Sequence, residues 1–171
     1  MQTKNTHCNA LPLTQSYYQG RTDIPLIEKT IGQYLDNIVD NYPNHPAIVV
    51  HHQQIRLTYR QYQQQINQLA MGLLSLGVKP GDRVGIWSPN NIEWCLTQFA
   101  TAKIGAIMVC INPAYRPSEL KYALNSVECS TLITASEFKA SNYINMLNEL
   151  APELKDSQAG ELNLNALPHL K

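Results

Sequence analysis

The 171-residue sequence has little of what marks several simple functional classes. Its 13 basic and 13 acidic residues cancel, so it offers no basic surface field for nucleic acid or an anionic membrane. A helix that crosses a bilayer needs roughly 20 apolar residues, whereas the longest apolar run, Ile104–Ile111, has the length of a strand. The first residues contain no apolar core of signal-peptide length. We therefore expect no nucleic-acid partner, no transmembrane segment and no export.

Cysteine is too sparse for a zinc or redox motif. The chain has four cysteines, spread widely and without a Cys-x-x-Cys pair: Cys8, Cys95, Cys110 and Cys129. Zinc and dithiol motifs need close pairs, because two thiolates must converge on one centre. We expect reduced thiols rather than a disulfide framework, and on this ground the sequence predicts a cytoplasmic protein.

Glycine is missing where a nucleotide-binding loop would need it. A dinucleotide site places Gly-x-Gly-x-x-Gly between a strand and a helix, because only glycine lets the backbone approach the pyrophosphate. Here the apolar run Arg83–Trp87 is followed by Ser88-Pro89-Asn90-Asn91, which holds no glycine, and Pro89 has no N–H to donate. The P-loop pattern is absent as well. These absences disfavour a Rossmann dehydrogenase.

Metal-ligand and nucleophile motifs are also absent. No His-Glu-x-x-His or Gly-x-Ser-x-Gly pattern occurs. The adjacent pair His51-His52 falls in a predicted hairpin turn, where neighbouring side chains point to opposite faces. A solvated turn explains this pair better than a metal site. The sequence therefore predicts no metal ligand and no catalytic residue.

The first half of the chain carries clear local signals. Thr30 is a good N-cap for a helix with one apolar stripe, and Thr58 with Gln61 has the spacing of a capping box before a second helix that ends near Gly77. Between the two helices, two short apolar runs predict a β-hairpin: Ala47–Val50 and Ile55–Leu57.

From Arg83 onward, apolar strand-like runs alternate with helical patterns. The predicted strands are Arg83–Trp87, Ala106–Ile111 and Thr131–Ala135, and the predicted helices are 91–104, one capped by Ser118, and 141–150. Apolar strands separated by amphipathic helices indicate a parallel sheet covered on both faces. The predicted fold class is α/β, with a Rossmann-like, mostly parallel sheet and helices on both faces.

The pattern divides the chain into three parts. Residues 1–25 are polar and contain Pro12, Pro25 and Gly20, so they are predicted to form an arm without regular structure. Residues 26–154 form the folded unit. Residues 155–171 lose periodicity and are predicted to be a surface linker at a truncated end.

Three residues are candidate ligand contacts by position alone. Trp94, on the helix after Pro89, fits either an apolar ligand pocket or simple packing of that helix on the sheet. Tyr115 and Arg116 follow the carboxyl end of the strand Ala106–Ile111. Open α/β sheets bind ligands at that edge.

Several segments resemble one enzyme family. They are LTYRQY (57–62), LGVKPGDRVGIWSPNNIEW (76–94) and IGAIMVCINPAYRPSELKYALN (104–125), and the similarity extends from about Tyr17 to Leu154. The chain resembles acyl-CoA synthetases of the adenylate-forming, AMP-binding superfamily. The resemblance is greatest to medium- and long-chain fatty-acid–CoA ligases.

The resemblance implies an activity that these residues do not complete. Family members activate a carboxylic acid with Mg-ATP to an acyl-adenylate and then transfer the acyl group to coenzyme A. Residues 26–154 would be part of the N-terminal subdomain, about a third of a full-length member. The phosphate loop, the adenine-binding motif, the ribose-binding Asp and the catalytic Lys of the family have no counterpart here. The resemblance therefore implies no cofactor in this chain and no catalysis by this chain alone. ATP, Mg and coenzyme A are implied only for the complete enzyme.

The same resemblance leaves two interpretations open and suggests where ligands would bind. The alternative to part of an enzyme is a non-catalytic binding or scaffolding module descended from the synthetase. The Ala114–Arg116 loop would lie near the path of coenzyme A, and Lys139 is the only cation in TASEFKAS (134–141), where some relatives present a basic residue to the coenzyme's 3′-phosphate. A solvated lysine at a helix start is the other interpretation of Lys139. Fatty acid and coenzyme A are the expected partners of the complete enzyme. The chain itself is expected to associate through an exposed apolar face or with a separately encoded remainder.

Overall fold

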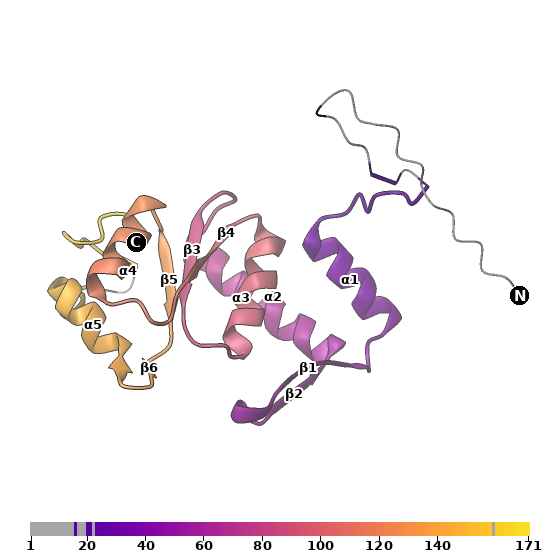
Figure 1. Cartoon of the computed structure of the whole chain (residues 1–171), viewed down its shortest axis with the longest axis horizontal. Coiled ribbons are helices and arrows are strands. Elements are labelled where there is room, and N and C mark those ends of the chain that lie inside the picture. Colours follow the sequence, from indigo (N-terminus) through magenta and orange to yellow (C-terminus); the bar gives the residue numbers. More distant parts are fainter. Residues whose placement is uncertain (1–15, 17–19, 22, 159) are drawn as a thin grey trace, which may run out of the picture.

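A computed structural model describes residues 16, 20–21, 23–158 and 160–171 (Figure 1). Most of the predicted arm, residues 1–25, therefore lies outside the described residues. The centre of the fold is a three-stranded sheet in the order β4-β3-β5. The strands are β3 (Arg83–Trp87), β4 (Ile107–Ile111) and β5 (Thr131–Thr134), and both pairings are parallel. The predicted parallel sheet is confirmed.

Helices cover both faces of this sheet, as predicted (Figure 1). Successive residues of β3 point to opposite faces. Val84 joins a core cluster with α1 (Ile31–Asn41), α2 (Tyr59–Ser75) and α3 (Ile92–Ile104). Trp87 joins the other cluster, with α4 (Pro117–Ser126) and α5 (Tyr143–Leu150). Because β3 is buried on both sides, its sequence is continuously apolar after Arg83.

The predicted helix starts at Thr30 and Thr58 are confirmed. In each case the threonine hydroxyl accepts a hydrogen bond from the backbone N–H three residues later, at 3.2 Å from Gln33 and 3.3 Å from Gln61. The glutamine side chain in turn accepts from the threonine backbone N–H. Each box satisfies two backbone donors that have no partner within the helix. Gly77 follows α2 with φ +83°, as expected of a residue just past a helix end.

The predicted hairpin is also present. Strands β1 (Pro46–Val50) and β2 (Ile55–Thr58) pair antiparallel. They are joined by a 3-10 helix, His51–Gln53, and by Gln54 at φ 55°.

The start of α4 differs from the prediction. Ser118 was expected to cap it, but the helix begins at Pro117 and Arg116 occupies the N-cap position. Proline suits the first helical position because its missing N–H would have no helical partner there. The Glu119 carboxylate accepts a hydrogen bond from the Arg116 backbone N–H at 2.9 Å, which stabilises this start.

The segment after β5 contains a small hairpin that the sequence did not predict. Strands β6 (Glu137–Phe138) and β7 (Ser141–Asn142) pair antiparallel around a turn in which Lys139 has φ 53°. Helix α5 begins only at Tyr143, capped by the Asn142 side chain, which accepts from the Asn145 N–H at 2.8 Å. The predicted helix start at Ser141 is therefore two residues early, and Lys139 lies in a turn.

The prediction of a surface linker for residues 155–171 is wrong for its last part. Leu164, Leu167 and Leu170 are buried in the core cluster of α4 and α5. The Asn125 side chain donates to the Ala166 carbonyl at 3.0 Å, and the Lys171 N–H donates to the Ser130 carbonyl at 3.1 Å. The three leucines lie outside any regular helix or strand, so the sequence shows no periodic pattern there. They nevertheless cover apolar surface of α4 and α5.

Asp36 joins three helices, and this contact predicts a pH-dependent effect. Its carboxylate accepts from Gln63 of α2 at 2.6 Å and pairs with Lys103 of α3 at 2.5 Å. Burial alone would raise the pKa of Asp36, but the hydrogen bonds from Lys103 and Gln63 and the charge of Lys103 hold it below its usual value. Its side chain is 43% exposed, so solvent screens the pair.

We expect Asp36→Asn to lower the free energy of unfolding by about 0.5–1 kcal/mol at pH 7. A lowered folded-state pKa gives stability that is present above the unfolded value and is lost as the pH falls through the folded value. The difference between variant and wild type should therefore vanish in urea unfolding well below pH 3.8. Asp40→Asn, at an exposed position of the same helix, is the control. A difference that persists at pH 2 would contradict the electrostatic explanation.

One edge of the sheet is apolar and open. In the part of the chain that the structure describes, β4 pairs only with β3, and its residues Ile107 and Cys110 are exposed. None of the helices in that part combines the length and hydrophobicity that a bilayer span requires.

Candidate functional site

The carboxyl ends of the three parallel strands meet at one edge of the sheet. The loops there begin at Ser88 after β3, Asn112 after β4 and Ala135 after β5. A cavity of about 250 Å³ lies at this edge, lined by Ser88, Asn91, Glu93, Ile133, Thr134, Ala135 and Ser136. In open α/β sheets this edge is where ligands bind, so it is the candidate site.

Tyr115 and Arg116 lie in the loop at this edge, as predicted from their position. The loop is tightly turned: the Asn112 side chain accepts from the Ala114 N–H at 2.9 Å, and the Asn112 carbonyl accepts from the Tyr115 N–H at 3.0 Å. Tyr115 is half-buried and Arg116 is exposed. The Arg116 guanidinium donates to the Ser141 hydroxyl at 3.1 Å.

Lys139 lies in the neighbouring β6–β7 hairpin and is exposed. Its ammonium group is 5.1 Å from the centroid of the Phe138 ring, within the range of a cation–π contact. The bond from Arg116 to Ser141 joins this hairpin to the loop of Tyr115. The fold therefore brings the loop of Tyr115 and Arg116 next to the hairpin of Lys139.

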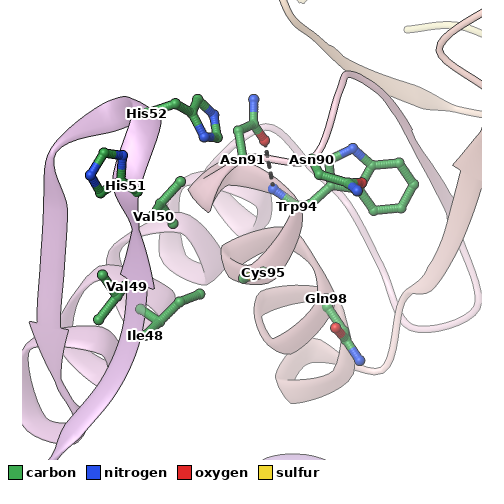
Figure 2. Close-up of a pocket in the computed structure, with 10 residues that line it drawn as sticks. All are labelled: Ile48, Val49, Val50, His51, His52, Asn90, Asn91, Trp94, Cys95 and Gln98. Atoms are coloured by element: carbon green, nitrogen blue, oxygen red, sulfur yellow. Dashed lines mark hydrogen bonds between the residues drawn. The ribbon is translucent and has the colours of Figure 1, made fainter.

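Trp94 lines a second, larger cavity of about 480 Å³ between the β1–β2 hairpin and α3, which shares Asn91 with the first cavity (Figure 2). Its indole N–H donates to the Ser88 carbonyl at 2.7 Å, so the ring also packs α3 against the loop after β3. Both predicted interpretations, packing and pocket lining, therefore have a structural basis. Trp94 and Tyr115 line different cavities.

The histidine pair lines the same larger cavity as Trp94. Figure 2 shows His51 and His52 on the hairpin side, with Asn90, Asn91 and Trp94 on the side of α3. Both histidines are exposed. Among the residues with described placement, no three His, Cys, Asp or Glu side chains gather as a metal site would require.

Sequence reasoning missed residues that connect these elements across the fold. Gln53 joins the hairpin to α3: its side-chain oxygen accepts from the Ile92 N–H at 2.7 Å, and its amide donates to Glu93 at 3.0 Å. Ser141 and Tyr143 contact the loop after β4. No local pattern marks these residues, because each partner lies about 25 to 40 positions away in sequence.

Two of the thiols that the structure describes, those of Cys95 and Cys129, are not poised as nucleophiles. Burial raises the pKa of Cys95, and burial likewise raises that of Cys129, whose side chain lies beneath β3. The thiolate is the reactive form, so a raised pKa disfavours covalent catalysis at these positions.

A family model described as AMP-binding enzyme matches residues 35–167. The chain belongs to this family. The resemblance identified from the sequence segments is therefore confirmed. The match covers all three parallel strands and the loops at their carboxyl ends.

This AMP-binding family member is most informatively compared with acyl-CoA ligases. It is 44% identical over 163 residues to the medium-chain acyl-CoA ligase ACSF2, mitochondrial, of Rattus norvegicus, which covers 95% of this chain and 26% of the relative. It is 40% identical over 146 residues to the putative acyl-CoA synthetase YngI of Bacillus subtilis, covering 85% and 27%. The chain thus spans about a quarter of the length of these curated relatives.

Solved structures support the same fold. The N-terminal domain of FACL13 from Mycobacterium tuberculosis matches with a TM-score of 0.62 and 27% identity, over 80% of this chain and 38% of that one. The N-terminal subdomain of NpsA from Klebsiella oxytoca matches with a TM-score of 0.59 and 26% identity, over 66% and 29%. The predicted fold, the N-terminal subdomain of an adenylate-forming enzyme, is confirmed.

The predicted cytoplasmic location is contradicted by these relatives. The matching ligases of Rattus norvegicus and Bos taurus are both named as mitochondrial. The physical reason is simple: reduced thiols exclude an oxidising compartment, but they do not distinguish between two reducing ones.

Proposed function

We propose that this chain is part of an ATP-dependent fatty-acid–CoA ligase. In that reaction, a carboxylate oxygen attacks the α-phosphorus of ATP and releases pyrophosphate, leaving an acyl-adenylate. The coenzyme A thiol then attacks the acyl carbon, loses its proton and releases AMP. The observation that carries the proposal is the 44% identity to a medium-chain acyl-CoA ligase over 163 residues.

ATP and Mg would be held mainly by residues outside these 171. The described residues gather no carboxylate cluster of the kind a metal site needs, and the sequence contains no glycine-rich phosphate loop. Oxygen ligands and a cradle of backbone N–H groups are what Mg and a triphosphate require. We therefore propose that this chain contributes substrate-side surface and is not catalytic alone.

The loop of Tyr115 and Arg116, with Lys139 beside it, is proposed to face coenzyme A. Support comes from their placement at the carboxyl edge of the sheet and from the exposure of both cations. Trp94 is proposed to contact the acyl chain. The cavity it lines has apolar walls at Ile48 and Val50 and, at about 480 Å³, lies within the usual range for ligand pockets.

The test of the function uses the complete ligase that carries this chain. Incubation with ATP, Mg, coenzyme A and octanoate should yield octanoyl-CoA and AMP in equal amounts. Palmitate and acetate in parallel reactions would define the chain-length preference. A folded, complete protein that forms no acyl-CoA from any of these acids would overturn the proposal.

The alternative is a non-catalytic binding or scaffolding module. The two proposals differ in whether a phosphate loop, which these 171 residues do not contain, is encoded together with them. The reading frame downstream of the Lys171 codon separates the two: a sequence like YTSGTTG there supports the ligase, and its absence supports the module.

We expect Lys139→Ala to raise the KM for coenzyme A a few-fold in the complete ligase and to leave the KM for ATP unchanged. An exposed charge contact is worth about 1 kcal/mol or less, and salt screens it. The measurement is initial rate against coenzyme A concentration at low and high salt. Lys79→Ala is the matched control, because Lys79 is exposed near the amino end of β3, the opposite edge of the sheet. An unchanged KM for coenzyme A at low salt would remove Lys139 from the site.

A further inference from the structure

Two aromatic rings stack directly below the loop after β4. Trp87, the last residue of β3, and Tyr143, the first residue of α5, have ring centroids 3.8 Å apart and planes 15° apart. Both side chains are fully buried. Such a stack fixes the orientation of both rings, so the polar atom at the edge of each ring has a defined direction.

Both polar atoms donate to the same loop. The Trp87 indole N–H donates to the Asn112 carbonyl at 3.2 Å, and the Tyr143 hydroxyl donates to the Pro113 carbonyl at 2.6 Å. Two successive carbonyls of one turn thus accept hydrogen bonds from two rings that stack on each other. Burial raises the pKa of Tyr143, so its hydroxyl keeps the proton that it donates.

The segment of Tyr143 also holds the far end of the loop. Ser141, two residues earlier in β7, accepts from the Arg116 guanidinium at 3.1 Å. The loop Asn112–Arg116 is therefore held at its start by Trp87 and Tyr143 and at its end by Ser141. Because Ser141 and Tyr143 flank Asn142 in one continuous segment, the loop and the β6–β7 hairpin of Lys139 are joined as one unit.

We propose that Trp87 and Tyr143 form a two-point clamp that positions the Asn112–Arg116 loop, relative to the β6–β7 hairpin, for coenzyme A. The coenzyme part of this inference rests on the proposed function. In it Trp87 and Tyr143 are positioning residues, since they act on coenzyme A only through the loop. Packing alone would need only the two rings, whereas the clamp needs the donors as well.

Tyr143→Phe separates these two roles, because it keeps the stacked ring and removes the donor. Hydrogen exchange of the 171-residue chain, followed by mass spectrometry at single-residue resolution, is the direct measurement. We expect the amides of Ala114 and Tyr115 to exchange roughly three- to ten-fold faster, as for the loss of one net hydrogen bond. The amides of β3 should be unchanged. Tyr34→Phe, at an exposed tyrosine of α1, is the control and should alter no loop amide. Unchanged exchange at Ala114 and Tyr115 in Tyr143→Phe would overturn the clamp.

A kinetic measurement tests the link to coenzyme A. In the complete ligase, Tyr143→Phe should raise the KM for coenzyme A several-fold and leave the KM for ATP and the melting temperature close to those of wild type. Faster loop exchange with an unchanged KM for coenzyme A would overturn the positioning role for this substrate. A wild-type ligase without acyl-CoA formation would instead overturn the proposed function, and the exchange result would still decide the clamp.

Ser141→Ala provides a second, independent variant. It removes the acceptor of the Arg116 guanidinium at the other end of the loop and leaves the aromatic stack in place. We expect the Arg116 amide to exchange faster than in wild type, and the change to be larger when Ser141→Ala and Tyr143→Phe are combined. Loop exchange equal to wild type in the double variant would overturn the proposal.

Discussion

Residues 1–171 produced alone should give no ATP–pyrophosphate exchange with octanoate or palmitate above a no-protein control. The chemistry depends almost entirely on positioning and on charge stabilisation at the phosphorus. The sequence contains no glycine-rich loop whose N–H groups could surround the triphosphate. Loss of a single oxyanion-hole donor costs about 10²–10³-fold in other enzymes, so the absence of a whole set of donors around the triphosphate should place the rate below detection.

The control is the complete ligase assayed at the same molar concentration, which should show the exchange. Circular dichroism and a cooperative melting transition would verify that the 171-residue chain is folded in the assay. Exchange above background by the folded chain would contradict the prediction, because it would mean that these residues hold the triphosphate themselves.

Gly85→Val should destabilise the fold by about 1–3 kcal/mol or more, as overpacking of a core does. Gly85 is the middle residue of β3 and is buried. A Cβ placed there would lie 3.0 Å from the Cys129 sulfur, 3.1 Å from the Ile111 Cδ1 and 3.2 Å from the Leu132 Cδ1. Alanine could be accommodated by small shifts of these side-chain ends, but the two further methyl groups of valine would need space that the central strand does not have.

Gly72→Val is the matched control for the same substitution. Gly72 lies in α2, where an added Cβ would meet nothing within 4 Å. Valine and glycine differ by only a few tenths of a kcal/mol in helix propensity, in favour of valine. Urea unfolding should therefore show a lower midpoint for Gly85→Val than for wild type. The midpoint of Gly72→Val should not be lowered. Equal midpoints would show that β3 has room for a side chain at Gly85.

The sequence was a good guide where structure is decided by neighbours along the chain. Thr30 and Thr58 bond to residues three positions on, so their capping boxes could be recognised from spacing alone. The strand Arg83–Trp87 could be recognised because burial on both faces requires a continuous apolar run. The parallel sheet follows from the alternation of such runs with helices.

The sequence was a poor guide where a distant partner decides the conformation. Leu164 and Leu167 are ordered by the surfaces of α4 and α5, and nothing near them in sequence indicates this. The β6–β7 hairpin is only two residues long on each side, too short to show an alternating pattern. Ser118 has a residue type that often caps helices, but proline also fits a first helical turn, and α4 begins at Pro117.

The sequence predicted where Tyr115 and Arg116 lie, but not which distant residues contact their loop. Tyr115 and Arg116 were expected at the carboxyl edge of the sheet because they follow a strand, and they lie there. Their contact with the segment of Ser141 could not be foreseen, because it depends on how the chain returns after β5. The roles of Tyr115, Arg116, Lys139 and Trp94 in binding remain predictions.

The open edge of β4 has a consequence for handling the protein. Among the described residues β4 pairs on one side only, and the outer side of such an apolar edge strand presents N–H and C=O groups on which another chain can add a strand. With equal numbers of basic and acidic residues, the chain has little charge repulsion to oppose that encounter. Protein concentration should then affect how long a preparation stays monodisperse, because strand addition between chains is bimolecular. Ile107→Lys, at an exposed position of this edge strand, should oppose such pairing and keep the protein monodisperse for longer.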